Sequence, residues 1–375
     1  MESESEAQQV AHARGAGPQL AWILVLAYLL VVAYASLRPF TDWRLPPEEI
    51  RRFLTAPWPP YITLDDVLVN IGAYLPLGFL LAIALTRLGP RTAVLLAVAG
   101  AGLLSTAMEA AQTLMPTRVA SNVDVLANTL GGLIGALAAP LFAPTHGLGI
   151  RLARARREWF VHGRTADIGL MLVCLWLVTQ LHPTGQIFGT GQLRDTFELP
   201  VWFVHTPQAQ VTAEAAVTGF NLLGIGLLVV ALTLDTVPRG LVIAAVVGTA
   251  VAIKAWAGLA LAKLAGSLAW LTPGVALGVA AAAITLYALS HVPRRLQWTG
   301  AAVSLAMAIA AINIAPENPY QTLPPQLLAQ GPTHFLSFSG IVRALSELWP
   351  FVGILYATVA AGTPRDAISL LPVSR

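Results

Sequence analysis

Apolar runs of roughly 17 to 22 residues recur along this chain, and each is long enough to cross ~30 Å of hydrocarbon. Charged residues make up only 11% of the 375 residues, whereas a soluble domain carries about 25%. The sequence therefore predicts an all-α fold, a polytopic transmembrane helical bundle of about ten spans. The predicted spans lie near residues 20–37, 67–85, 92–114, 124–143, 167–181, 215–233, 240–260, 272–290, 298–315 and 341–361.

The basic residues predict how the chain is oriented in the membrane. The densest group, RLARARREWF, begins at Arg151 between the fourth and fifth predicted spans. Arg87, Arg91 and Arg239 fall in other segments on the same side. Because positive residues favour cytoplasmic segments, we expect both the N-terminus and the C-terminus inside the cell. The dense group is interpreted as a topology anchor, with anionic-lipid binding by an interfacial helix as the alternative.

Changes in composition divide the chain into five parts. Residues 1–19 are polar and lack periodicity, which predicts a disordered cytoplasmic tail. A four-span unit at 20–143 and a basic cytoplasmic loop at 144–166 follow, then a second four-span unit at 167–297. The final two spans and the C-terminal tail occupy 298–375. Both four-span units contain the same features in the same order: a long outer loop, a span with an Asn, and a Pro-Arg pair before the following span. This shared order predicts a parallel internal repeat with a degenerate second copy.

A polar segment interrupts the apolar sequence between Ser105 and Gly132. Glu109 lies roughly 10 Å along its helix from Pro116, where the third span ends, and so falls within the hydrocarbon region. A carboxylate at this depth is costly and normally faces a partner or a water-filled cavity. Several polar residues nearby are three or four positions apart and share helix faces. The candidate ligand-binding residues are Asp66, Asn70, Glu109, Gln112, Arg118, Asp124 and Asn128.

The connection between the third and fourth spans is short, which makes these helices antiparallel neighbours. We therefore expect Glu109, Arg118 and Asp124 to converge on one seam. Arg118 would offset two acids that could not otherwise stay ionised near lipid. The cluster is then either a structural ion-pair lock or a ligand site that opens outward, and we favour the site.

Several of these residues also have a purely structural interpretation. Asp65 or Asp66 can cap the start of the second span, and Ser121 followed by Asp124 resembles a capping box for the fourth. Asn70 and Asn128 can join helices through hydrogen bonds, and the GGLIG stretch predicts a close-packing face.

Two stretches of sequence resemble the VanZ-like family: DDVLVNIGAYLPLGFLL, and LLSTAMEAAQTLMPTRVASNVDVLANTLGGLIGA. They contain an Asn and a Pro-Leu-Gly-Phe in one span, an acid followed by x-x-Gln, an Arg after a Pro, and an Asp-x-x-x-Asn that opens the next span. The resemblance covers residues 20–143, and the later spans resemble an extended multi-span subgroup. It implies a multi-pass protein of the bacterial cytoplasmic (inner) membrane with a role in the cell envelope. The family is associated with glycopeptide, chiefly teicoplanin, resistance.

Three functions fit the polar cluster. The favoured one is a binding or accessory protein, not an enzyme, that holds the polar head of a membrane lipid or a lipid-linked envelope precursor through Arg118. The second is an intramembrane enzyme in which Glu109 or Asp124 is the catalytic base and Arg118 the oxyanion partner. The third is a proton-coupled transporter or flippase with Glu109 as its proton site.

Other classes of site find no support in the sequence. The chain carries no His-Glu-x-x-His, Walker or Gly-x-Ser-x-Gly motif, and no His lies in the cluster, so we expect no metal and no cofactor. A magnesium ion held by Asp66, Glu109 and Asp124 is the alternative. The basic residues form no large soluble patch, which argues against nucleic acid. No protein partner is identifiable, and the second unit is expected to lack an equivalent acid and Arg.

Overall fold

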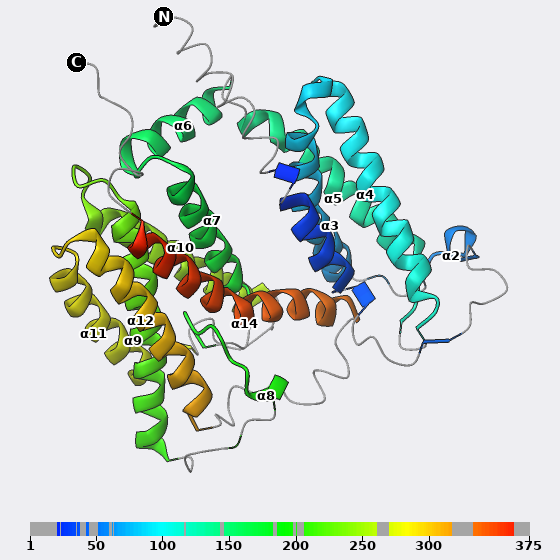
Figure 1. Cartoon of the computed structure of the whole chain (residues 1–375). Helices are drawn as coiled ribbons and strands as arrows, with labels where there is room; N and C mark the ends of the chain where they lie inside the picture. The colour runs from blue at the N-terminus through cyan, green and yellow to red at the C-terminus, as the bar shows by residue number, and fades with distance from the viewer. Residues whose placement is uncertain are drawn as a thin grey trace, which may run out of the picture. The chain divides into compact units, whose positions relative to one another are not determined.

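The computed structural model of the chain consists of α-helices (Figure 1). In the part of the chain that it describes there is no β-strand, and Phe160 and Thr233 form an isolated antiparallel bridge. The predicted disordered tail, residues 1–19, lies outside this part. The structure describes residues 21, 22, 24–34, 36, 37, 43, 44, 52–59, 62, 64–115, 118–142, 146–182, 186–197, 200, 206–260, 270–316 and 333–363.

Each of the ten predicted spans coincides with a helix. Among the described residues, seven helices are long and apolar enough to cross a membrane. The first, fifth and eighth predicted spans correspond to shorter helices, which are Leu24–Tyr34, α7 (Arg164–Thr179) and α11 (Pro273–Leu289). The protein is therefore an all-α, polytopic membrane protein, while the count of ten spans and the orientation stay predictions.

The helices divide into two compact units, each described below by itself. Unit 1 comprises Met1–Ala153 together with Gln330–Ile341, and unit 2 comprises Arg154–Ala329 together with Val342–Arg375. The last two predicted spans therefore belong largely to unit 2.

Unit 1 is built on three long helices, α3 (Leu64–Ala84), α4 (Pro90–Gln112) and α5 (Asn122–Ala138). The most extensive packing joins α3 to α5, and α4 packs against both of them (Figure 1). The helix Leu24–Tyr34 adds Val32 to the apolar core of this group. Shorter elements of the same region are α2 (Arg52–Thr55), η1 (Thr86–Leu88), η2 (Ala139–Phe142) and the first part of α6 (Gly147–Trp159).

Local sequence explains where two of these helices begin. Gly89 has φ 90, a conformation that favours glycine, and Pro90 follows at the first helical position, where its missing N–H costs nothing. Ser121 is the N-cap of α5, and its side chain accepts the N–H of Val123 at 3.2 Å. The prediction that Ser121 caps the fourth span is therefore confirmed.

Glycines let α3 and α5 approach each other closely. A Cβ added to Gly131 would lie under 3.0 Å from the carbonyl oxygen of Ile71, and one added to Gly135 would meet the carbonyl oxygen of Leu75 in the same way. Small residues of this kind allow helix backbones to touch in a membrane protein. The prediction that GGLIG forms a close-packing face is confirmed.

Unit 2 is centred on α9 (Pro207–Leu232), which packs mainly against α11 and α12 (Arg294–Ile314). Within the apolar window of α9, 72% of the residues are buried, whereas the corresponding share is 22% for α10 (Arg239–Ala260), the lowest of the seven candidate spans. The helix α10 is therefore the least enclosed of these spans. The remaining helices of this region are α7, α8 (Arg194–Phe197) and α14 (Thr333–Gly362), whose first residues fall in unit 1.

Two helices of unit 2 begin with the same Thr-Pro pair. The hydroxyl of Thr206 accepts the N–H of Ala209 at 3.1 Å at the start of α9, and Thr272 caps α11 in the same way. In each case the threonine is the N-cap and a proline occupies the first helical position, which fixes where the span starts.

Candidate functional site

Glu109 is the buried acid of unit 1, with only 4% of its surface exposed. It lies near the C-terminal end of α4 and continues a stripe of buried alanines along that helix. Its Oε2 accepts the backbone N–H of Ser121 at 2.8 Å. The acid of one helix therefore satisfies a donor at the start of the next, where the helix dipole also favours negative charge.

Asp124 does not complete the capping box that the sequence suggests. In such a box the acid three residues after the N-cap would accept the N-cap N–H. Here Glu109 takes that N–H, and Oδ1 of Asp124 accepts Nδ2 of Asn70 at 2.9 Å instead. Both Asn70 and Asp124 are buried, so their bond joins α3 to α5 inside the unit. The capping-box prediction is therefore wrong in its second half, because a tertiary contact competes for the acid.

Arg118 lies in the connection between α4 and α5 and is partly buried near Glu109. Burial lowers the pKa of its guanidinium, and the nearby Glu109 carboxyl acts in the opposite direction. Asp124 is also within electrostatic range of Glu109. The structure thus brings Glu109, Arg118 and Asp124 together at one seam of unit 1.

Gln112 and Asn128 extend the cluster in two directions. Nε2 of Gln112 donates to the backbone carbonyl of Ser36 at 3.0 Å, which ties α4 to the segment after Leu24–Tyr34. Nδ2 of Asn128 donates to Oγ of Ser105 at 2.9 Å, which joins α5 to α4 one turn further along. The Oδ1 atom of Asn128 is buried and has no hydrogen-bond partner among the described residues. This acceptor is therefore open to a further donor.

Asp66 lies at the edge of the cluster. The helix α3 begins at Leu64, so Asp66 is within its first turn and one turn before Asn70. An acid in the first turn is favourable because of the helix dipole. Asp66, Glu109 and Asp124 do not form a metal site, since the described residues contain no group of three acidic, His or Cys side chains that could hold an ion. The arrangement therefore does not support the magnesium alternative.

Sequence reasoning missed two residues of this region. Ser105 lies one turn before Glu109, and Tyr74 lies one turn after Asn70, so both share the helix faces of residues already selected. The Tyr74 hydroxyl is buried and lies beside Ser105. The signal that could have found them is this spacing of four residues.

Unit 2 has buried charged residues of its own, at positions that differ from those of Glu109 and Arg118, so the expectation that it lacks an equivalent acid and Arg stays a prediction. Glu214 in α9 is 4% exposed, and its carboxylate accepts Nε2 of Gln210 at 3.0 Å and the hydroxyl of Thr272. Arg194 is also buried and donates to the carbonyl of Asn313 at 2.8 Å. Unit 2 therefore has buried charged groups of its own, built from residues outside the predicted set.

Comparison with known proteins finds similarity in the first third of the chain. Residues 19–143 match the family model described as VanZ/LLP1. No curated protein and no solved structure matches the chain. The matched residues include all seven members of the predicted ligand-binding set.

Proposed function

From the premise that residues 19–143 form a VanZ-like domain of a helical membrane protein, we propose that the polar cluster of unit 1 is a binding site. Its ligand would be the polar head of an amphiphilic molecule or of a lipid-linked precursor of the bacterial envelope. The protein would then act in the bacterial inner membrane as a binding or accessory protein, in a role of the glycopeptide-resistance type that the family suggests.

The observation that carries this proposal is the convergence of charges on buried positions at one end of apolar helices. Arg118 supplies a planar donor group suited to phosphate or carboxylate. Glu109 and Asp124 supply acceptors for amines and hydroxyls, and Asn70 holds Asp124 in place at 2.9 Å. A ligand head that carries both an anion and hydrogen-bond donors would match this set.

An unused polar atom favours a ligand site over a closed ion-pair lock. The Oδ1 of Asn128 is buried without a hydrogen-bond partner among the described residues. Buried polar groups are normally satisfied, and a lock that served only the fold would leave a cost of about 1–3 kcal/mol for each such group. A donor on a bound polar head could satisfy this atom.

Native mass spectrometry of the purified full-length protein tests the proposal. We expect a lipid or lipid-linked precursor to remain bound to the wild-type protein and to be lost in Glu109→Gln and Arg118→Gln, while the amount of folded protein in the membrane is unchanged. Arg91→Gln is the matched control, because Arg91 is exposed at the opposite end of α4. Equal ligand retention in all variants would refute the site.

The same variants connect the site to envelope function. Expressed in a susceptible bacterium, the wild-type protein is expected to raise the teicoplanin concentration that inhibits growth, and Glu109→Gln is expected to abolish this effect. A ligand that is recovered chemically altered, in amounts that depend on Glu109, would favour the enzyme alternative. Proton movement that depends on Glu109 in sealed vesicles would favour the transporter.

A further inference from the structure

Unit 2 contains an open cavity of 2120 Å³ that is separate from the cluster described above. Its sides are formed by Ile243 and Val247 of α10 and by Val279 and Leu286 of α11, and Leu222 of α9 contributes to its inner wall. Ile243 and Val247 are four positions apart and Val279 and Leu286 are seven apart, so each pair shares one face of its helix. The volume exceeds the roughly 300–1,000 Å³ of ordinary small-molecule clefts.

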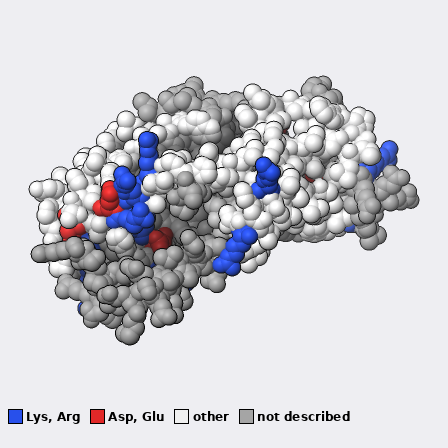
Figure 2. Space-filling view, turned by 90° about the horizontal axis from the view of Figure 1, so that it is seen from above, with Lys and Arg blue, Asp and Glu red and all other residues white. Residues whose placement is uncertain are grey.

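The mouth of the cavity is basic. Its lining includes Arg164, Arg239 and Arg294, which are the first residues of α7, α10 and α12, together with Arg295 and a single acid, Asp235. Three helices therefore begin around one opening. Figure 2 shows a group of Lys and Arg side chains, with acidic side chains next to it, on the face seen from above. An anionic group would be attracted to this opening.

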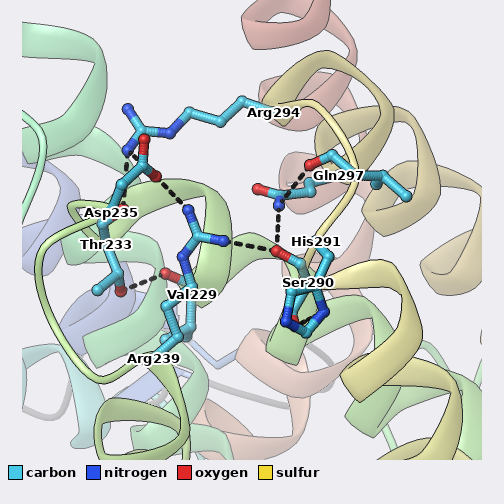
Figure 3. A network of polar contacts seen from close by, with 9 residues as sticks. Val229, Thr233, Asp235, Arg239, Ser290, His291, Arg294 and Gln297 are labelled. Atoms are coloured by element: carbon cyan, nitrogen blue, oxygen red, sulfur yellow. Dashed lines mark hydrogen bonds and ion pairs between the residues drawn. The ribbon is translucent and has the colours of Figure 1, made fainter.

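A polar network holds two of these arginines in fixed positions (Figure 3). Asp235 accepts hydrogen bonds from Arg239 and, at 3.0 Å, from Arg294. Arg239 also donates to the carbonyl of Ser290 at 2.5 Å, and Arg294 donates to the carbonyl of Thr233 at 3.0 Å. The Nε atoms of both arginines remain without partners in the described part of the chain. The network therefore places two guanidinium groups side by side with donors to spare.

The other two arginines of the mouth are exposed and not engaged by the protein. No hydrogen bond or ion pair with a described residue involves the side chain of Arg164 or Arg295. Two positioned cations and two unengaged ones thus face an opening whose interior is apolar. This combination matches an amphiphile with an anionic head.

We propose that this cavity of unit 2 binds a membrane lipid with an anionic phosphate headgroup. The headgroup lies at the mouth among the arginines, where charge-assisted hydrogen bonds to phosphate are strong. The acyl chains lie in the apolar slot between α10 and α11. The size and apolar lining of the slot favour a lipid over free phosphate, which would use the mouth alone. The low burial of α10 leaves one side of the slot accessible from the membrane.

The test is native mass spectrometry of the full-length protein in a neutral detergent, with phosphatidylglycerol, phosphatidylcholine or inorganic phosphate added in turn. We expect one phosphatidylglycerol to bind in preference to phosphatidylcholine, and inorganic phosphate at equal concentration to leave it bound. Arg164→Gln with Arg295→Gln should weaken this binding by about tenfold or more, because two charge-assisted contacts are removed. The double variant Arg87→Gln with Arg91→Gln has the same change in net charge and is expected to bind normally.

A second pair of variants tests the apolar slot. Ala244 lines the cavity and is exposed, so Ala244→Phe is expected to fill the slot and to abolish lipid binding without repacking the core. Ala245 is exposed beside it but does not line the cavity, so Ala245→Phe is expected to bind lipid normally. The proposal fails if both phenylalanine variants bind equally, if phosphatidylcholine binds as well as phosphatidylglycerol, or if inorganic phosphate displaces the lipid.

Discussion

The carboxylate of Glu109 accepts the backbone N–H of Ser121 at 2.8 Å, so a side chain of α4 completes the N-cap of α5. The hydroxyl of Ser121 meanwhile accepts the N–H of Val123 at 3.2 Å. Two backbone N–H groups at the start of α5 thus have acceptors. The N–H of Val123 is accepted by the Ser121 hydroxyl, and the N–H of Ser121 by Glu109 of the neighbouring helix. The acid is therefore part of the fold as well as a candidate for the site.

Glu109→Ala is expected to lower the free energy of unfolding by about 1–3 kcal/mol, because the Ser121 N–H would lose its acceptor. Glu109→Gln keeps an oxygen in the same place and should lose less. Thermal unfolding in detergent measures the difference. If the two variants lose the same stability, the hydrogen bond to Ser121 is not the cause. If Glu109→Gln, Arg118→Ala and Asp124→Asn lower the stability by similar amounts, and each folded molecule keeps its function, the cluster is a structural ion-pair lock.

The bond between Asn70 and Asp124 should appear as an energetic coupling. Asn70→Ala and Asp124→Ala, alone and combined, form a double-mutant cycle for which we expect an interaction energy of about 1–2 kcal/mol. Asn70→Ala combined with Ser105→Ala is the comparison, since no hydrogen bond joins those side chains. That pair should be additive within about 0.5 kcal/mol. If the stability changes of Asn70→Ala and Asp124→Ala simply add, the hydrogen bond between these side chains is contradicted.

Gly135→Ala is expected to destabilise unit 1 by about 1–3 kcal/mol, because the new methyl group would overlap the carbonyl oxygen of Leu75 and force α3 and α5 apart. Gly72 in α3 has open space where a Cβ would lie, so Gly72→Ala should not destabilise the protein. The measurement compares the unfolding temperatures of the two variants with that of the wild-type protein, and only Gly135→Ala should lower it. Equal effects would mean that the helices do not touch at Gly135.

His182 should make stability fall with acid. Burial, with Lys254 and Arg343 nearby, lowers its pKa to about 3 in the folded protein. The unfolded chain takes up this proton near pH 6.5, so the unfolded state binds more protons between pH 6.5 and about 3. The stability from neutral His182 is present above pH 6.5 and is lost as the pH falls, by up to about 1.4 kcal/mol per pH unit.

His182→Gln is therefore expected to flatten the dependence of the unfolding temperature on pH across this window. His162→Gln, at an exposed position, is the control and should leave the dependence as it is in the wild-type protein. A steeper loss of stability with acid in His182→Gln would show that the sign is wrong.

The orientation stays open to a direct test with reporter fusions. Because the densest basic segment should be cytoplasmic, we expect a cytoplasmic reporter to be active after Arg156, and a periplasmic reporter to be active after Ala56 and Thr117. A periplasmic reporter that is active after Arg156 and inactive after Ala56 would reverse the topology.

The helices of this protein could be predicted from sequence because a membrane span depends on local composition. The N-cap Ser121 could also be predicted, since a cap needs only the right residue just before an apolar run. The acceptor for the Ser121 N–H could not be predicted. That acceptor is Glu109, which lies twelve residues earlier on another helix. The capping-box spacing within α5 favours Asp124 instead. Contacts between helices decided the outcome.

The basic cavity of unit 2 was missed for a related reason. Arg239 follows Pro238 at the start of its span, and Arg294 and Arg295 follow Pro293 at the start of theirs. In the sequence alone, arginines at such positions indicate only which side of the membrane a segment lies on. Their importance comes from the packing of α7, α10 and α12, which begin around one opening. No periodicity within one helix contains that information. Buried Glu214 was missed because its hydrogen-bonding partner Thr272 lies 58 positions away.

The glycines of α5 set the spacing between two helices of unit 1. Because Gly131 and Gly135 rest against main-chain carbonyls of α3, the distance between these helices is set by backbone atoms and not by side chains that can change rotamer. The helices α3 and α5 therefore form a rigid pair. Asn70 on α3 and Asp124 on α5 keep their relative positions because the helices that carry them keep theirs. The side chains of Asn70 and Asp124 therefore meet at 2.9 Å across a helix pair whose spacing is fixed.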